Sequence, residues 1–140
     1  VMTSTYNDVR AVIEGRIATE MASSPAIPVV YANSSFIPPN ADSWLQVQLQ
    51  FNGNAYFTLQ APTTGFNRQT GIVLINIFTK AGVGTGANYT IAERVKDLFD
   101  RVTVNSVTFD PASGPLTITP SAPESYFQTQ VSVTFDAYLQ

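Results

Sequence analysis

The chain has 140 residues, with seven Lys or Arg side chains, ten Asp or Glu side chains and a formal net charge of -3. It contains no Cys and no His, which excludes disulfides, thiolate nucleophiles, Ser-His-Asp catalysis and zinc-type ligand sets. An acidic chain is also a poor binder of the nucleic-acid backbone. The length of the chain predicts that residues 1–140 form one domain. We expect no catalytic, cofactor or metal site in it.

The charged residues are distributed unevenly. Residues 1–101 carry all seven basic side chains and seven acids, whereas residues 102–140 carry three acids and no base. Residues 17–67 hold only two charges, on Glu20 and Asp42. Because protein interfaces are depleted of Lys, Glu and Asp, this stretch predicts assembly with other subunits.

The first predicted element is a helix that begins at Ser4 or Thr5. Thr5 and Asp8 have the spacing of a capping box, and Pro25 limits the helix at its other end. Apolar residues recur at helical spacing at Tyr6, Val9, Ile13, Ile17 and Met21. Gly15 inside the helix costs about 1 kcal/mol relative to Ala, so packing must hold this helix in place.

Residues 29–32 are predicted to be a short strand, followed by an irregular loop over residues 34–43. Pro38 and Pro39 lie in that loop and cannot donate to a sheet ladder. We therefore expect this loop to contact a neighbouring subunit rather than the core.

Residues 44–51 alternate between apolar and polar side chains, which is the period of a strand with one buried face. Gln46, Gln48 and Gln50 are predicted to face outward, with Trp44 on their side. This glutamine face has two interpretations, an interface or a solvated sheet face, because polar alternation occurs in both.

The sequence Asn52-Gly53-Asn54 is a hairpin turn signal, so residues 55–60 are predicted to return as the partner strand. Residues 61–69 are then predicted to be a projecting loop. Phe66 and Arg68 in this loop are candidate interface residues, because interfaces favour aromatic and Arg side chains.

A long apolar strand is predicted over residues 70–79. Its most apolar run, residues 71–78, is far shorter than the roughly 20 residues of a membrane span, so we expect no membrane. The glycine loop after it has the spacing G-x-G-x-G and lacks the Lys-Ser or Lys-Thr of a phosphate loop. We predict that residues 82–88 bind no nucleotide. A second helix should follow, with a capping box at Thr90 and Glu93.

Strands are predicted over residues 104–109, 116–119 and 126–139. The fold class is therefore α+β, with two helices packed on one face of an antiparallel-rich sheet. The predicted core residues are Ile13, Ile17, Leu49, Ile75, Ile77, Val95, Leu98, Phe99, Val133 and Phe135.

Several segments together resemble a known family. They are TYNDVRAVIEGRIATEM, PAIPVVYANSSFIPP, WLQVQLQF, RQTGIVLINIFT and GVGTGANYTIAERVKDLFD. Over nearly the whole chain, these phrases resemble the tail-terminator proteins of long-tailed bacteriophages, the group related to minor tail protein U. A related neck or tail-completion protein is the nearest alternative.

The resemblance implies a hexameric ring on the last ring of the tail tube, assembled in the host cytoplasm and located at the tail-neck of the virion. Its implied partners are copies of itself, the tail tube protein and a head-completion or stopper protein. Genomic DNA would pass through the lumen without specific binding. Residues 102–140, which contain no basic side chain, have two interpretations: they line such a lumen, or they form an ordinary acidic surface.

Two other functional classes remain as alternatives. An enzyme would have to use carboxylate, Lys or Tyr chemistry. Its active site would be recognised as a concave site whose residues have shifted pKa values. A stand-alone binding module would use exposed aromatic residues such as Trp44, Phe57 and Phe66 as a platform.

Overall fold

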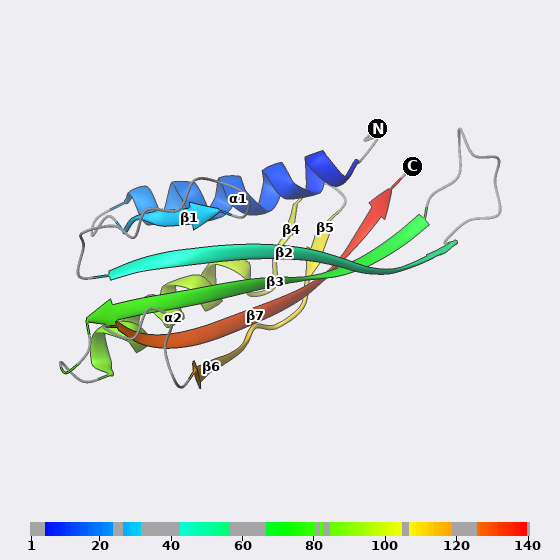
Figure 1. The fold of residues 1–140 in the computed structure, drawn as a ribbon. Coiled ribbons are helices and arrows are strands. Elements are labelled where there is room, and N and C mark those ends of the chain that lie inside the picture. The colour runs from blue at the N-terminus through cyan, green and yellow to red at the C-terminus, as the bar shows by residue number, and fades with distance from the viewer. Residues whose placement is uncertain are drawn as a thin grey trace.

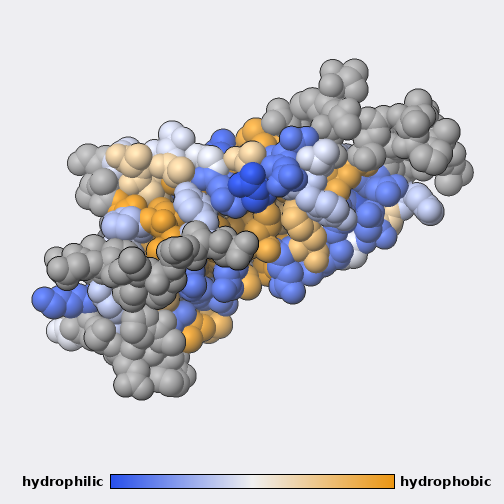
Figure 2. Space-filling view, turned by 45° about the horizontal axis from the view of Figure 1, so that its top comes forward, coloured by the Kyte–Doolittle hydropathy of each residue, from blue (hydrophilic) through white to orange (hydrophobic). Residues whose placement is uncertain are grey.

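The computed structural model describes residues 5–23, 27–31, 43–56, 67–80, 82, 85–104, 107–118 and 126–139. This part of the chain forms a single α+β domain with two helices and one seven-stranded sheet. The domain is elongated along the three long strands (Figure 1). In the view of Figure 2, hydrophobic residues reach its surface in separate patches with hydrophilic residues between them. None of the described helices is long and apolar enough to cross a membrane.

Helix α1 (Tyr6–Ala22) begins as its sequence predicts. The Thr5 hydroxyl accepts a hydrogen bond from the Asp8 backbone N–H at 3.2 Å, and the Asp8 carboxylate accepts one from the Thr5 N–H at 3.0 Å. These two bonds complete a capping box. The predicted apolar stripe is buried at Val9, Ile13, Ile17 and Met21.

The strands are β1 (Val29–Tyr31), β2 (Ser43–Tyr56), β3 (Asn67–Lys80), β4 (Thr103–Val104), β5 (Val107–Phe109), β6 (Ser113–Ile118) and β7 (Tyr126–Leu139). Their order is β1-β2-β3-β7-β5-β4, and β6 also pairs with β7. β1 runs parallel to β2 and the other pairs are antiparallel. The single strand predicted over residues 104–109 is instead two short strands, β4 and β5, which pair with each other.

Both helices pack on the same face of the sheet, as predicted. On β3 this face carries Val73, Ile75 and Ile77, which share one hydrophobic cluster with the buried stripes of α1 and α2 (Gly86–Phe99). Of the ten predicted core residues, eight are buried and confirmed. Leu49 and Leu98 are half-buried and pack against this core.

The hairpin predicted at Asn52-Gly53-Asn54 is wrong. β2 continues through these residues to Tyr56 and stays paired with β3, with a register shift between Phe51 and Asn54. The backbone carbonyls of Asn52 and Gly53 accept hydrogen bonds from the Gln69 side chain at 2.7 and 3.3 Å. A β-bulge with satisfied carbonyls therefore takes the place of the turn.

The capping box predicted at Thr90 and Glu93 is also wrong, because α2 begins four residues earlier, at Gly86. Its N-cap residue, Thr85, makes no side-chain capping bond. The Thr90 hydroxyl instead donates to the Gly86 carbonyl one turn back, at 2.9 Å. The early start follows from Asn88, which is fully buried and whose side chain ties the first turn to the sheet.

Candidate functional site

The face of the sheet opposite the helices is the candidate site, and we call it the open face. Register pairs place side chains of β2, β3 and β7 in rows across it. Four consecutive rows are Trp44-Phe78-Gln128, Gln46-Asn76-Gln130, Gln48-Leu74-Ser132 and Gln50-Ile72-Thr134. All twelve of these residues are uncharged. Trp44, Phe78, Asn76 and Gln128 are buried within the subunit, and the other eight are exposed or half-buried. The accessible part of the open face therefore has the uncharged composition that interfaces favour.

A network of side-chain amides crosses this face. Asn76, only 5% exposed, lies at its centre on β3. Its Nδ2 donates to Gln46 Oε1 at 3.5 Å, and its Oδ1 accepts from the Nε2 atoms of Gln128 at 3.1 Å and Gln130 at 3.2 Å. One asparagine thus links three strands, and its bond to Gln46 leaves fewer of that side chain's hydrogen-bonding groups free for a partner.

The other two predicted glutamines are free to contact a partner. Gln48 and Gln50 are exposed, while their row neighbours Leu74 and Ile72 are half-buried. Exposed amides beside partly exposed aliphatic side chains form a surface that can bury apolar area without burying a charge. Sequence reasoning missed the two aliphatic residues, because β3 is apolar at most positions and its period does not reveal which side chains face outward.

Trp44 shares the glutamine side, as predicted, but it does not face solvent. It is 1% exposed and stacks on Phe78, with the ring centroids 4.1 Å apart and an interplanar angle of 9°. Tyr126 packs edge-on against it at 5.9 Å. The interpretation of Trp44 as an exposed aromatic platform is therefore wrong, because neighbouring strands cover its ring with their own aromatic side chains.

Arg68 lies at the other end of the open face and belongs to β3, not to the predicted loop. Its Nη2 donates to Asp136 Oδ2 at 2.9 Å. This hydrogen bond, followed by the negative charge of Asp136, raises the pKa of the Arg68 guanidinium. The side chain is nevertheless 51% exposed, so Arg68 keeps donors for a second partner.

The structure therefore brings four predicted interface residues, Gln46, Gln48, Gln50 and Arg68, onto one face. The remaining candidates, Pro38, Pro39 and Phe66, lie outside the described residues, as does most of each loop that holds them. Within the described ranges, no three Asp or Glu side chains come together as a metal site.

Comparisons with known proteins agree with this fold. A family model described as phage tail terminator protein matches residues 8–135. No curated protein matches the chain. A solved structure is similar with a TM-score of 0.70 and 21% sequence identity, over 95% of this chain and 95% of that one. At this identity the structural likeness establishes a shared fold.

Proposed function

This chain belongs to the phage tail terminator family, and from that premise we propose that it caps the tail tube as a homomeric ring, a hexamer, which ends tail growth and joins the tail to the head. The family is structural, and its members act in the virion tail together with other tail components. We propose no enzymatic activity. The tail tube protein and a head-completion or stopper protein are the proposed partners, with assembly in the host cytoplasm.

Apart from family membership, the proposal of a ring rests on the uncharged open face. A ring uses heterologous contacts, so each subunit needs two different contact surfaces. The four central rows of the open face offer one such surface, with Gln48 and Gln50 exposed beside the half-buried Leu74 and Ile72. Charged residues make up roughly a quarter to a third of a well-solvated surface, so the uncharged accessible part of this face favours contact with another molecule.

The distribution of acids supports the proposed passage of DNA. Residues 102–140 contain no Lys or Arg, and Asp110 and Asp136 are two of their three acids. A lumen with few cations lets DNA slide, because it offers no strong phosphate contacts. We therefore propose that genomic DNA crosses the ring without specific binding.

Light scattering coupled to size-exclusion chromatography tests the ring. The subunit has a mass of 15.2 kDa, so a closed hexamer should elute at about six times that mass, alone or with tail tubes. The double change Gln48→Lys and Gln50→Lys should weaken assembly or capping, because it places two charges in the contact. Ala11→Lys, at an exposed position on α1, is the matched control and should assemble normally.

Tail length separates this function from a different neck or tail-completion role. Without a terminator, tails should grow beyond their normal length, whereas loss of another neck protein should leave their length unchanged. A chain that is monomeric at every concentration and with tail tubes present would favour a stand-alone binding module.

A further inference from the structure

Asn52 and Gly53 form the only Asn-Gly pair in the sequence. Both residues are exposed on β2, at the register shift between Phe51 and Asn54. The backbone nitrogen that follows an asparagine can attack the carbonyl carbon of the asparagine side chain, and a glycine leaves that approach open because it has no Cβ atom. By sequence, Asn52 is therefore the asparagine of this chain that is most open to attack by its own backbone.

The fold gives no conformational reason for a glycine at position 53. Gly53 does not have a positive φ, and a bulge requires glycine where that residue is left-handed. A Cβ atom at this position would meet only Thr70 Oγ1, at the ordinary contact distance of 3.8 Å. Glycine inside a strand is destabilising relative to alanine, and such exceptions to local preference are expected at functional positions. What glycine supplies here is an unhindered backbone nitrogen beside the Asn52 side chain.

The buried side chain of Gln69 holds the backbone of this pair. It is only 1% exposed, and its Nε2 donates to the carbonyls of Asn52 at 2.7 Å and Gly53 at 3.3 Å. The Gly53 carbonyl also accepts a hydrogen bond from the Thr70 hydroxyl at 3.0 Å. Gln69 Oε1 in turn accepts one from the Tyr6 hydroxyl of α1 at 3.3 Å. The two carbonyls are therefore fixed by β3 and, through Gln69, by the helix.

These hydrogen bonds oppose the attack. The Gly53 nitrogen reaches Asn52 Cγ only after rotation about the bond between Cα and the carbonyl carbon of Asn52. The same rotation swings the Asn52 carbonyl oxygen away from Gln69 Nε2 and breaks their 2.7 Å hydrogen bond. The attack therefore needs a local opening of the bulge, and the net contribution of one ordinary hydrogen bond makes such an opening roughly tenfold rarer.

We propose that Asn52 is a site of self-modification by deamidation, and that Gln69 controls its rate. The Gly53 nitrogen forms a bond to Asn52 Cγ, the bond between Cγ and Nδ2 breaks, and the proton of the Gly53 nitrogen ends on the leaving amide, which departs as ammonia. Water then opens the succinimide ring. Addition of water at Cγ gives aspartate, and addition at the backbone carbonyl carbon gives isoaspartate. Water is the only co-reactant, and nothing is oxidised or reduced.

Either product places a carboxylate in a strand that has no charge. β2 contains no Lys, Arg, Asp or Glu, and Asn52 follows Gln50 of the proposed ring contact by two residues. Isoaspartate also lengthens the backbone, which disturbs the pairing of β2 with β3 beyond the bulge. Modified subunits should therefore assemble less well, because interfaces are depleted of carboxylates. This consequence rests on the proposed ring, whereas the chemistry at Asn52 does not.

Peptide mass spectrometry tests the site on the full chain, incubated at mildly alkaline pH either folded or unfolded in guanidinium chloride. Asn52 of the parent chain should deamidate at least roughly tenfold more slowly when folded. Gln69→Met keeps the size of the buried side chain but donates no hydrogen bond, so it should lose most of this protection with an unchanged rate in denaturant. Tyr6→Phe, at an exposed residue, removes only the bond to Gln69 and should raise the folded rate by a smaller factor. It serves as the test if Gln69→Met does not fold.

Gly53→Ala is the matched control. It keeps Asn52, and its Cβ atom fits the folded chain, so it should slow deamidation both folded and in denaturant. Asn54, which is exposed on the same strand and is followed by Ala55, is the internal reference and should keep its amide over the same period.

Two results would overturn the control by Gln69: a folded parent chain that deamidates as fast as the unfolded one, or clamp variants as protected as the parent. Absence of deamidation at Asn52 even in denaturant would overturn the site itself. For assembly, Asn52→Asp should raise the subunit dissociation constant relative to Asn52→Gln, and equal constants would overturn the expected consequence. A chain that never assembles, even with tail tubes, would overturn the proposed ring and leave the chemistry at Asn52 standing.

Discussion

Two Gly→Ala substitutions should change the stability of the subunit in opposite directions. Gly71 lies on β3 between Phe51 of β2 and Phe135 of β7. A Cβ atom at position 71 would lie 2.4 Å from Phe135 Cζ and 2.8 Å from the Gln50 backbone oxygen. Relief of these contacts requires movement of a fully buried ring and of a strand backbone. Overpacking of a core costs about 1–3 kcal/mol, and we expect Gly71→Ala to cost about 3 kcal/mol.

Gly15 in α1 is the matched site, because a Cβ atom there meets no atom within 4 Å. Ala is favoured over Gly inside a helix by about 1 kcal/mol, so Gly15→Ala should stabilise the subunit by about that amount. The two variants should therefore differ by about 4 kcal/mol, a large part of a typical unfolding free energy of about 5–15 kcal/mol.

Urea unfolding, followed by the fluorescence of the single Trp, measures both changes. Trp44 is buried, so its emission reports loss of the folded sheet. All variants must be compared at one protein concentration, because assembly adds apparent stability. A Gly71→Ala variant as stable as the parent chain would refute the packing described between Phe51 and Phe135.

Three further predictions concern α2, Tyr31 and the glycine loop. Asn88→Ala should lower the unfolding free energy by about 2–3 kcal/mol, since it leaves buried partners on β3 and β7 unpaired. Thr90→Ala should change it by less than about 0.5 kcal/mol. Urea titrations of the two variants measure both unfolding free energies. Burial, and then the charge of Glu14, raise the pKa of Tyr31 above its ordinary value of 10.0. Folding thus favours the neutral phenol, and this stabilisation is lost as the pH rises through the folded-state pKa. Unfolding free energies measured from about pH 9 to about pH 11 should fall less steeply for Tyr31→Phe, and an unchanged slope would contradict the assignment. Calorimetric titration with ATP or NAD should show no binding by residues 82–88, and micromolar binding would contradict that prediction.

Elements fixed by local signals were predictable from the sequence. Thr5 and Asp8 are three positions apart, so the capping box of α1 and its buried stripe could be identified from one short segment. The alternation of residues 44–51 likewise gave the correct faces of β2. In both cases the residues that determine the structure belong to the element itself or to its cap.

Elements fixed by distant partners were not predictable. Asn52-Gly53 has the local signal of a hairpin turn, but Gln69 satisfies its carbonyls across the strand pair and keeps β2 extended. The start of α2 depends on Asn88, whose side chain bonds to the Phe127 carbonyl and to the Thr129 hydroxyl. No sequence window that holds the helix signal includes those two residues.

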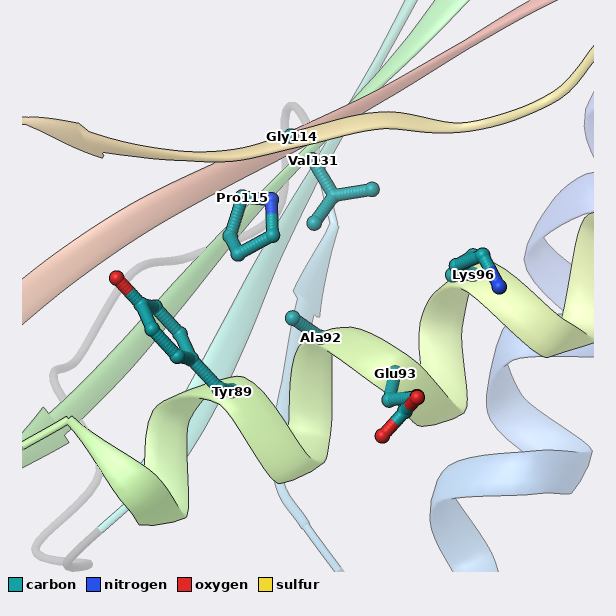
Figure 3. A pocket seen from close by; sticks show the side chains of 7 residues that line it. All are labelled: Tyr89, Ala92, Glu93, Lys96, Gly114, Pro115 and Val131. Atoms are coloured by element: carbon teal, nitrogen blue, oxygen red, sulfur yellow. The ribbon is translucent and has the colours of Figure 1, made fainter.

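Part of the candidate site was likewise predictable from the sequence, and part was not. Glutamine alternation identified the open face, but the amide network through Asn76 and the aliphatic side chains of Ile72 and Leu74 require the register of β2, β3 and β7. Away from this site, the groove between α2 and β6 that Tyr89 and Pro115 line (Figure 3) could not be predicted either, because these two residues come from separate elements and no periodic signal joins them.

The most direct test of the proposed function is the length of tail tubes grown in the presence of increasing amounts of this chain, measured by electron microscopy. A terminator ring should stop growth at a defined length and leave one ring of added density at one end of each tube. Tubes that continue to lengthen at saturating amounts of the chain, with no density at their ends, would contradict the proposal that it caps the tail.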